Sequence, residues 1–202
     1  MLRVFLLCLG LSLLPAAAHA DTLLVYGDSL SAGYGVPREQ SWVSLLARRL
    51  QEERRAYKVV NASLTGETTT GGAARIAQAL RTHQPSIVLV ELGANDGLRG
   101  QRLDVMQHNL EAIVAACRRA KARVLLIGMR LPPNYGTAYS EKFRRIYADV
   151  ARREKVPLVP FLLDGFAEDR TLFQPDAVHP TAQAQPLMLD TVWTALEPML
   201  RK

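Results

Sequence analysis

Ile87-Val88-Leu89-Val90 is a run of four apolar residues with no polar residue among them. A strand of this kind is buried on both faces, which is typical of parallel sheets covered by helices. Leu23-Leu24-Val25-Tyr26 and Val124-Leu125-Leu126-Ile127 show the same pattern. The three runs predict the centre of a parallel sheet whose two faces are both covered by helices.

The rest of the chain alternates between strand and helix patterns. Tyr57-Lys58-Val59-Val60 and Leu158-Val159 predict a second strand and a short fifth one. Apolar residues at helical spacing predict helices over residues 42–50, 72–81, 106–120, 143–154 and 181–200. We therefore expect a three-layer α/β/α fold with a five-stranded parallel sheet and right-handed crossovers. Sheets of this type bind ligands beyond the carboxyl ends of their strands.

The first twenty residues have the layout of a secretory signal peptide. Arg3 gives a positive start, residues 4–14 are apolar, and Ala18-His19-Ala20 is a small-x-small cleavage site. The apolar run is shorter than the ~20 residues that a membrane span needs. The residue before Cys8 is a leucine, where a lipoprotein signal needs a small residue. We therefore expect cleavage after Ala20, a periplasmic protein without stable membrane insertion, and a single domain over residues 21–202.

Charge and cysteine content limit the partners of the mature chain. Loss of Arg3 lowers the formal net charge from +6 to +5, and pairs such as Arg118-Arg119 place positive charge on helices. This positive charge either lies on a solvated surface with no binding role, or it attracts anionic acyl donors and phospholipid surfaces. No stripe of aromatic and basic residues indicates nucleic-acid binding. Cys117 is the one cysteine left, so an intramolecular disulfide is excluded, and we expect its side chain to be packed.

Polar groups follow each of the first three predicted strands. Gly27-Asp28-Ser29-Leu30 follows the first, Ser63-Leu64-Thr65-Gly66 the second, and Gly93-Ala94-Asn95-Asp96 the third. Each group alone has a structural explanation: a turn for Ser29, a positive φ for Gly66, and a helix cap for Asn95. We interpret Asp28 and Asp96 as carboxylates that stabilise turns. Together, these groups should meet at the carboxyl edge of the sheet.

A histidine and a carboxylate stand before the last predicted helix, in Asp176-Ala177-Val178-His179-Pro180. A carboxylate three positions earlier can fold back onto Nδ1 of His179 and leave Nε2 as a base, which is what a serine nucleophile needs. His83 and His108 lie on predicted helices among polar neighbours, and we expect both at the surface.

In this order and spacing the four groups resemble those of the SGNH hydrolase superfamily, with Ser29, Gly66, Asn95 and His179 at the four positions of its name. The resemblance spans the chain after residue 20. Residues 93–100 and 130–136 are similar to the thioesterase I/lysophospholipase L1 group of periplasmic enzymes, which includes arylesterases. The family implies a flavodoxin-like sheet, no metal or cofactor, and hydrolysis of esters and thioesters. We expect a monomer that acts on a small-molecule acyl ester or thioester.

The resemblance implies a role for each of these residues. Ser29 is the expected nucleophile, His179 its general base, and Asp176 the group that orients the imidazole. The expected oxyanion hole consists of the backbone N–H groups of Ser29 and Gly66 and the side-chain amide of Asn95.

An apolar loop, residues 129–135, follows the fourth predicted strand at the same edge of the sheet. It is either a surface connection or the wall of an acyl groove, stiffened by its two prolines. As a groove, it would offer substrate contacts through Met129, Leu131, Pro132 and Tyr135, together with the nearby Leu98. The glycines of Gly97-Leu98-Arg99-Gly100 favour movement of that segment on binding.

Other functions are less well supported. The chain lacks the G-x-S-x-G motif of α/β-hydrolases. It also has no H-E-x-x-H motif and few histidines and cysteines that could form a metal site. A non-catalytic acyl- or sugar-binding module on the same fold, or a carbohydrate O-acyl esterase, remains open. A binding module would have no use for the Asp176 and His179 pair.

Overall fold

Five parallel strands form the centre of the protein in the computed structural model, which describes residues 20–200. The strands are β1 (Asp21–Gly27), β2 (Tyr57–Asn61), β3 (Ile87–Glu91), β4 (Arg123–Ile127) and β5 (Leu158–Val159). Their order is β2-β1-β3-β4-β5, which is the flavodoxin-like order. The predicted fold class is therefore confirmed. The predicted signal peptide spans residues 1–20, of which residues 1–19 lie outside the described residues, and it remains a prediction.

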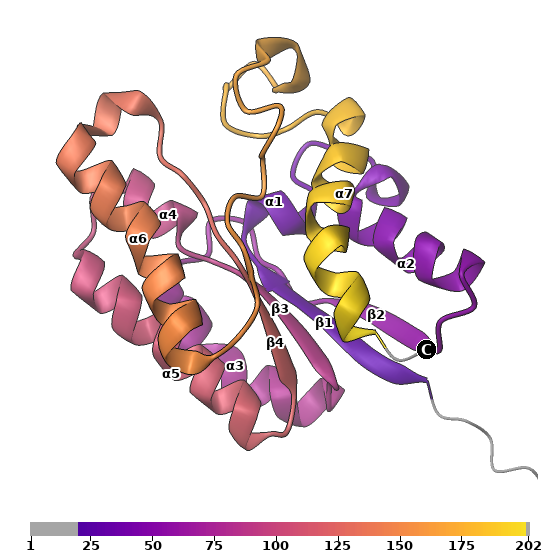
Figure 1. Cartoon of the computed structure of the whole chain (residues 1–202). Coiled ribbons are helices and arrows are strands. Elements are labelled where there is room, and N and C mark those ends of the chain that lie inside the picture. The colour runs from indigo at the N-terminus through magenta and orange to yellow at the C-terminus, as the bar shows by residue number, and fades with distance from the viewer. Residues whose placement is uncertain (1–19, 201–202) are drawn as a thin grey trace, which may run out of the picture.

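Helices cover both faces of the sheet (Figure 1). The α-helices are α1 (Ser29–Ala32), α2 (Trp42–Glu52), α3 (Thr69–His83), α4 (Ala94–Leu98), α5 (Leu103–Arg119), α6 (Thr137–Glu154) and α7 (Gln185–Leu196). The short 3₁₀ helices are η1 (Arg38–Gln40), η2 (Pro133–Tyr135), η3 (Arg170–Leu172), η4 (Ala182–Ala184) and η5 (Glu197–Met199). Helices α2 and α7 pack together on one face, and α3, α5 and α6 pack on the other. Among residues 20–200, no helix is both long and apolar enough to span a bilayer.

The core consists of the two central strands and the helix faces that cover them. All five residues of β3 are buried, and β1 pairs with it in a register that sets Gly27 opposite Glu91. Trp42 and Leu46 of α2 pack on one side and Cys117 of α5 on the other, all fully buried. Burial raises the pKa of the Cys117 thiol to about 12, so its expected role as a packed side chain is confirmed.

Several predicted helix boundaries were wrong by three residues or more. Helix α3 begins at Thr69, before the predicted 72, because the Thr68 side chain accepts a hydrogen bond from Gly71 N and caps it. The predicted final helix over 181–200 is divided into η4, α7 and η5. Pro198, which lacks an N–H, lies in η5, where the α-helical hydrogen bonding stops.

The crossover direction reverses between β1 and β3, since β2 lies on one side of β1 and β3 to β5 lie on the other. Ligands of open α/β sheets bind outside the carboxyl ends of the strands at such a reversal. The loops that follow β1 and β3 therefore define the place to look for a site.

Candidate active site at the carboxyl edge of the sheet

Ser29 stands at the sharp turn from β1 into α1. The Asp28 side chain caps this helix by accepting a hydrogen bond from Leu30 N at 3.0 Å. The turn also depends on Gly27, because a Cβ there would lie 2.6 Å from Glu91 Oε2 and 2.9 Å from Ser31 Oγ. Ser29 is 8% exposed, so it is accessible at the edge of an otherwise buried turn.

His179 bridges the serine and a carboxylate. Its Nε2 lies 2.9 Å from Ser29 Oγ, and its Nδ1 lies 2.7 Å from Asp176 Oδ2. With the Nδ1 proton donated to Asp176, Nε2 is left to accept the hydroxyl proton of Ser29. The structure thus brings together the three residues that the sequence assigned to nucleophile, base and orienting group.

The Asp176 carboxylate is held by the loop that carries the histidine. Its Oδ1 accepts hydrogen bonds from the backbone N–H groups of Val178 at 2.9 Å and His179 at 3.0 Å. Burial alone would raise the pKa of Asp176, but these bonds and the contact with the His179 ring lower it to about 2. The carboxylate is therefore ionised at neutral pH.

Tyr34 is a neighbour of His179 that the sequence did not point to. The two rings lie 4.5 Å apart between centroids and are tilted by 42°. Gln174 Nε2 donates to the carbonyl oxygens of Tyr34 at 2.8 Å and Pro180 at 3.0 Å, which ties the tyrosine segment to the histidine loop. An aromatic residue five positions after the serine has no distinguishing pattern, so only the packing reveals this contact.

Three N–H groups that follow β1, β2 and β3 have no hydrogen-bond partner within residues 20–200: the backbone N–H of Ser29, the backbone N–H of Gly66 and one N–H of the Asn95 amide. Gly66 has a φ of 78°, as its predicted turn conformation requires. The other Asn95 N–H donates to Asp28 Oδ2 at 3.2 Å. These are the donors that the sequence assigned to an oxyanion hole.

Asp96 connects two of the loops at this edge. It accepts hydrogen bonds from the backbone N–H of Thr69 at 2.9 Å and from its hydroxyl at 2.6 Å, which joins α4 to the first turn of α3. Asp28 and Asp96 both stabilise helix beginnings, as their interpretation from the sequence anticipated.

The proposed acyl-groove residues differ in exposure. Met129 is 5% exposed and belongs to the hydrophobic core, so it offers little surface to a ligand. Leu131 packs against Gly97, where a Cβ would lie 2.7 Å from Leu131 Cδ2. The Tyr135 hydroxyl donates to the carbonyl of Leu98 at 3.1 Å. Leu98, Leu131 and Tyr135 are half-buried and Pro132 is exposed, so these four side chains have surface that is open to solvent.

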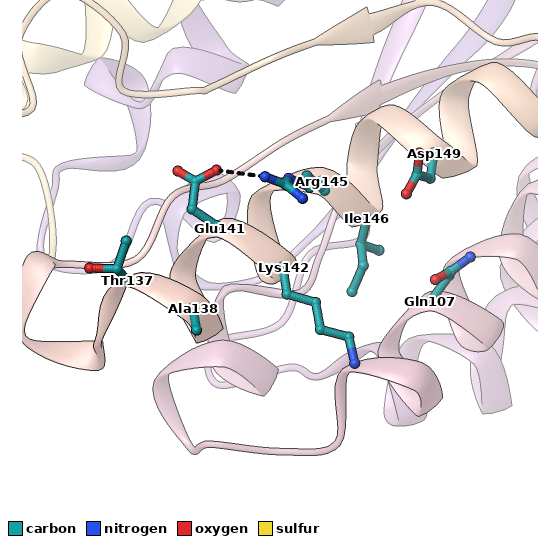
Figure 2. Close-up of a pocket in the computed structure, with 8 residues that line it drawn as sticks. All are labelled: Gln107, Thr137, Ala138, Glu141, Lys142, Arg145, Ile146 and Asp149. Carbon is teal, nitrogen blue, oxygen red and sulfur yellow. Dashed lines mark ion pairs between the residues drawn. The ribbon is translucent and has the colours of Figure 1, made fainter.

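A cavity of about 560 Å³ lies elsewhere, between α5 and α6 (Figure 2). Its lining is Gln107, Thr137, Ala138, Glu141, Lys142, Arg145, Ile146 and Asp149. Glu141 and Arg145 form an ion pair there at 3.7 Å. The lining contains none of the residues described above, so this cavity is separate from the candidate active site. Within residues 20–200, no group of three or more His, Cys, Asp and Glu side chains is arranged to hold a metal ion.

Comparison with known proteins places the chain in a family. Residues 25–186 match the GDSL-like Lipase/Acylhydrolase family. The chain is 48% identical to Esterase TesA of Pseudomonas aeruginosa over 193 residues, which cover 96% of each chain. It is 42% identical to Thioesterase 1/protease 1/lysophospholipase L1 of Escherichia coli (strain K12), over 91% of this chain and 87% of that one.

Solved structures agree. A crystal structure of TesA superposes with a TM-score of 0.87 at 47% sequence identity, over 89% of this chain and all of that chain. Because the family match spans residues 25–186, it includes the β1 turn, the loops after β2 and β3 and the histidine loop. The chain belongs to the GDSL-like Lipase/Acylhydrolase family of serine hydrolases, and it is an ester or thioester hydrolase of the group that contains these relatives.

Proposed function

We propose that residues 21–202 form one periplasmic catalytic domain, which hydrolyses carboxylic esters and acyl thioesters with Ser29, His179 and Asp176 as its catalytic triad. The observation that carries the proposal is the position of His179. Its two ring nitrogens lie 2.9 Å from Ser29 Oγ and 2.7 Å from Asp176 Oδ2. A histidine between a hydroxyl and an ionised carboxylate is arranged for general-base catalysis.

In the first half of the reaction, His179 takes the hydroxyl proton as Ser29 Oγ attacks the acyl carbonyl carbon. The imidazolium that forms is stabilised by the Asp176 carboxylate and then gives its proton to the departing alcohol or thiol. In the second half, a water molecule loses a proton to His179 and attacks the acyl-serine carbonyl. The bond between the acyl carbon and Ser29 Oγ then breaks, His179 returns the proton to Oγ, and the carboxylic acid leaves.

The negative charge on the carbonyl oxygen is stabilised by the backbone N–H groups of Ser29 and Gly66 and by the Asn95 amide. Support comes from the lack of a hydrogen-bond partner for these three N–H groups among residues 20–200, which leaves each of them free to donate to a substrate oxygen. A fixed donor of this kind contributes roughly 10²–10³ in turnover.

The acyl chain is proposed to lie along Leu98, Leu131, Pro132 and Tyr135, on the side of the edge where η2 approaches α4. The Tyr135 bond to the Leu98 carbonyl supports this, because it draws two apolar segments together. Aryl esters, acyl-CoA thioesters and lysophospholipids all carry the ester or thioester carbonyl that this chemistry needs.

The proposal is tested by covalent labelling with a fluorophosphonate, which reacts with an activated serine. The wild-type protein should be labelled at Ser29, and Ser29→Ala should lose both the label and ester hydrolysis while keeping its circular dichroism spectrum. Ser140→Ala is a matched control, since its hydroxyl lies on α6 and has no hydrogen-bond partner among the described residues. A Ser29→Ala protein that keeps a tenth of the turnover would contradict the proposal, and absence of any labelling would favour a binding module.

A further inference from the structure

Two buried carboxyl groups lie together under the turn that carries Ser29. Asp28 is 1% exposed and Glu91 is fully buried. Glu91 Oε2 accepts hydrogen bonds from the Asp28 backbone N–H at 3.3 Å and from the Ser31 hydroxyl at 2.7 Å. The Glu91 carboxyl therefore fixes the beginning of α1 through these two hydrogen bonds. It occupies the space that a side chain at position 27 would fill. The triad does not use either carboxyl.

Both oxygens of Asp28 receive donors. Oδ1 accepts from the Leu30 backbone N–H at 3.0 Å, and Oδ2 accepts from the Asn95 side-chain amide at 3.2 Å. A carboxyl whose two oxygens both accept hydrogen bonds is best matched by its ionised form. The bond to Oδ2 fixes the rotation of the Asn95 amide, and so it determines where the second, unpaired N–H of that amide points.

Glu91 has the opposite environment. Its Oε1 is buried and has no hydrogen-bond partner within residues 20–200. An unpaired buried charge costs far more than an unpaired neutral group. Burial raises the pKa of Glu91 well above its ordinary value, and the negative charge of Asp28 raises it further. Burial raises the pKa of Asp28 to about 6. The two acceptor bonds of Asp28 and the unpaired Oε1 of Glu91, together with these pKa directions, favour the charge on Asp28 and the proton on Glu91 at neutral pH.

We infer that Glu91 and Asp28 are a positioning pair for the oxyanion hole: neutral Glu91 supports the turn at Asp28, and the Asp28 carboxylate aims the Asn95 amide at the reacting carbonyl. The inference rests on the oxyanion role proposed above for Asn95. It gives a function to two carboxyls that lie beside the nucleophile and take no part in proton transfer.

The first test separates turnover from binding. In Asp28→Asn, one of the two donors that faced a carboxylate oxygen now faces an N–H, whichever way the new amide turns. We expect kcat to fall at least tenfold and KM to change less than threefold. In an Asn95→Ala background the same change should cost less than threefold, because Asp28 acts through Asn95. An equal loss in both backgrounds, or a wild-type kcat in Asp28→Asn, would overturn the inference.

Glu91→Gln supplies the conservative rescue. Glutamine is neutral like the protonated acid, and its oxygen can accept from Ser31 and Asp28 N. We expect Glu91→Gln to stay within fivefold of the wild-type kcat and Glu91→Ala to lose more than tenfold. The reverse pattern, with Asp28→Asn tolerated and Glu91→Gln severely impaired, would place the charge on Glu91 and refute the assignment. Should Asp28→Asn fail to fold, Glu91→Ala takes its place in the Asn95 cycle with the same expectations.

The second test detects the proton itself. Among the described residues, two titratable groups interact with this pair. The pKa of Tyr147 of α6 is raised by burial and further by the charges of Glu91 and Asp28, and His179 lowers the pKa of Asp28. A glutamic acid whose pKa rises on folding takes up a proton, so the stability it contributes is lost as pH rises toward the folded pKa. From pH 6.5 upward, above the Asp28 titration, the unfolding constant of the wild type should rise with pH relative to Glu91→Gln, by up to about tenfold per pH unit while folded Glu91 stays protonated.

The control for this measurement is Glu168→Gln, an exposed glutamate, which should keep the wild-type pH dependence. Parallel pH profiles for the wild type and Glu91→Gln would show that Glu91 is ionised and overturn the inference. Neither test depends on the outcome at Ser29. If Ser29→Ala remains active, the proposed function fails; if Ser29→Ala is inactive and the Asp28 and Glu91 tests fail, only this inference does.

Discussion

Nε2 of His179 lies 2.9 Å from Oγ of Ser29, although 150 positions separate the two residues in the chain. The contact forms because Ser29, which follows β1, and His179, in the loop before η4, lie at the same edge of the sheet. The loop is held by two hydrogen bonds, from Gln174 N to the His179 carbonyl and from Thr181 N to the Leu172 carbonyl, both at 2.8 Å. The geometry of the candidate base is therefore determined by the fold around it.

His179→Ala should reduce ester hydrolysis about as much as Ser29→Ala does, because a serine nucleophile and its base act as a unit. Turnover of a p-nitrophenyl ester is the measurement. His108→Ala, which changes an exposed histidine of α5, should retain wild-type turnover. A His179→Ala protein with more than a tenth of the wild-type kcat would mean that another group accepts the serine proton.

Asn95→Ala should lower kcat by roughly 10²–10³ and change KM little, because its free N–H gains strength only as charge develops on the carbonyl oxygen. Steady-state kinetics on one ester separates the two constants. A variant with a raised KM and an unchanged kcat would assign Asn95 to substrate binding and remove it from the oxyanion hole.

Asp176 should stabilise the fold in a pH-dependent way. Its pKa is lowered to about 2 in the folded protein from an ordinary value of 3.8. A lowered folded pKa contributes stability that is present above the unfolded pKa and lost as pH falls through the folded one. The difference in urea midpoint between the wild type and Asp176→Asn should therefore shrink between pH 4 and pH 2. A constant difference over this range would show that the carboxylate charge does not contribute.

Leu131→Asp should weaken the preference for longer acyl chains and spare acetyl esters. Each methylene of substrate that becomes buried gains up to about 0.8 kcal/mol, so wild-type kcat/KM should rise with chain length and then level off. Rates on a series of p-nitrophenyl esters give the profile. Leu187→Asp, at an exposed leucine of α7, is the control. Equal losses on acetyl and long-chain esters would mean that Leu131 supports the fold and does not select the acyl chain.

Export should remove the first twenty residues and leave Asp21 as the new N-terminus. Intact mass or N-terminal sequencing of protein from the periplasmic fraction gives the answer. A mature chain that still contains residues 4–14 would contradict both the cleavage site and the proposed localisation.

The candidate catalytic residues could be named from the sequence because their signals are local. An apolar run such as Ile87-Val88-Leu89-Val90 indicates a covered strand by itself, and a polar group directly after such a run is placed at the carboxyl edge. Asp176 and His179 are three positions apart, so the sequence alone indicates that they can pair. The boundaries of α3 and of the last helix were less accurate, because they depend on the Thr68 cap and on where Pro198 interrupts the hydrogen bonding.

By itself the sequence determined the fold class, the strands that carry each loop, and the identity of the nucleophile, base and oxyanion candidates. Only the tertiary structure decided that Met129 is a core residue, that Tyr34 lies against His179, and that Glu91 is buried beneath Asp28. The reason is physical. Periodicity and residue type act over a few neighbouring positions, whereas burial and the partner of a carboxyl depend on the strand register that sets Gly27 opposite Glu91, residues 64 positions apart in the chain.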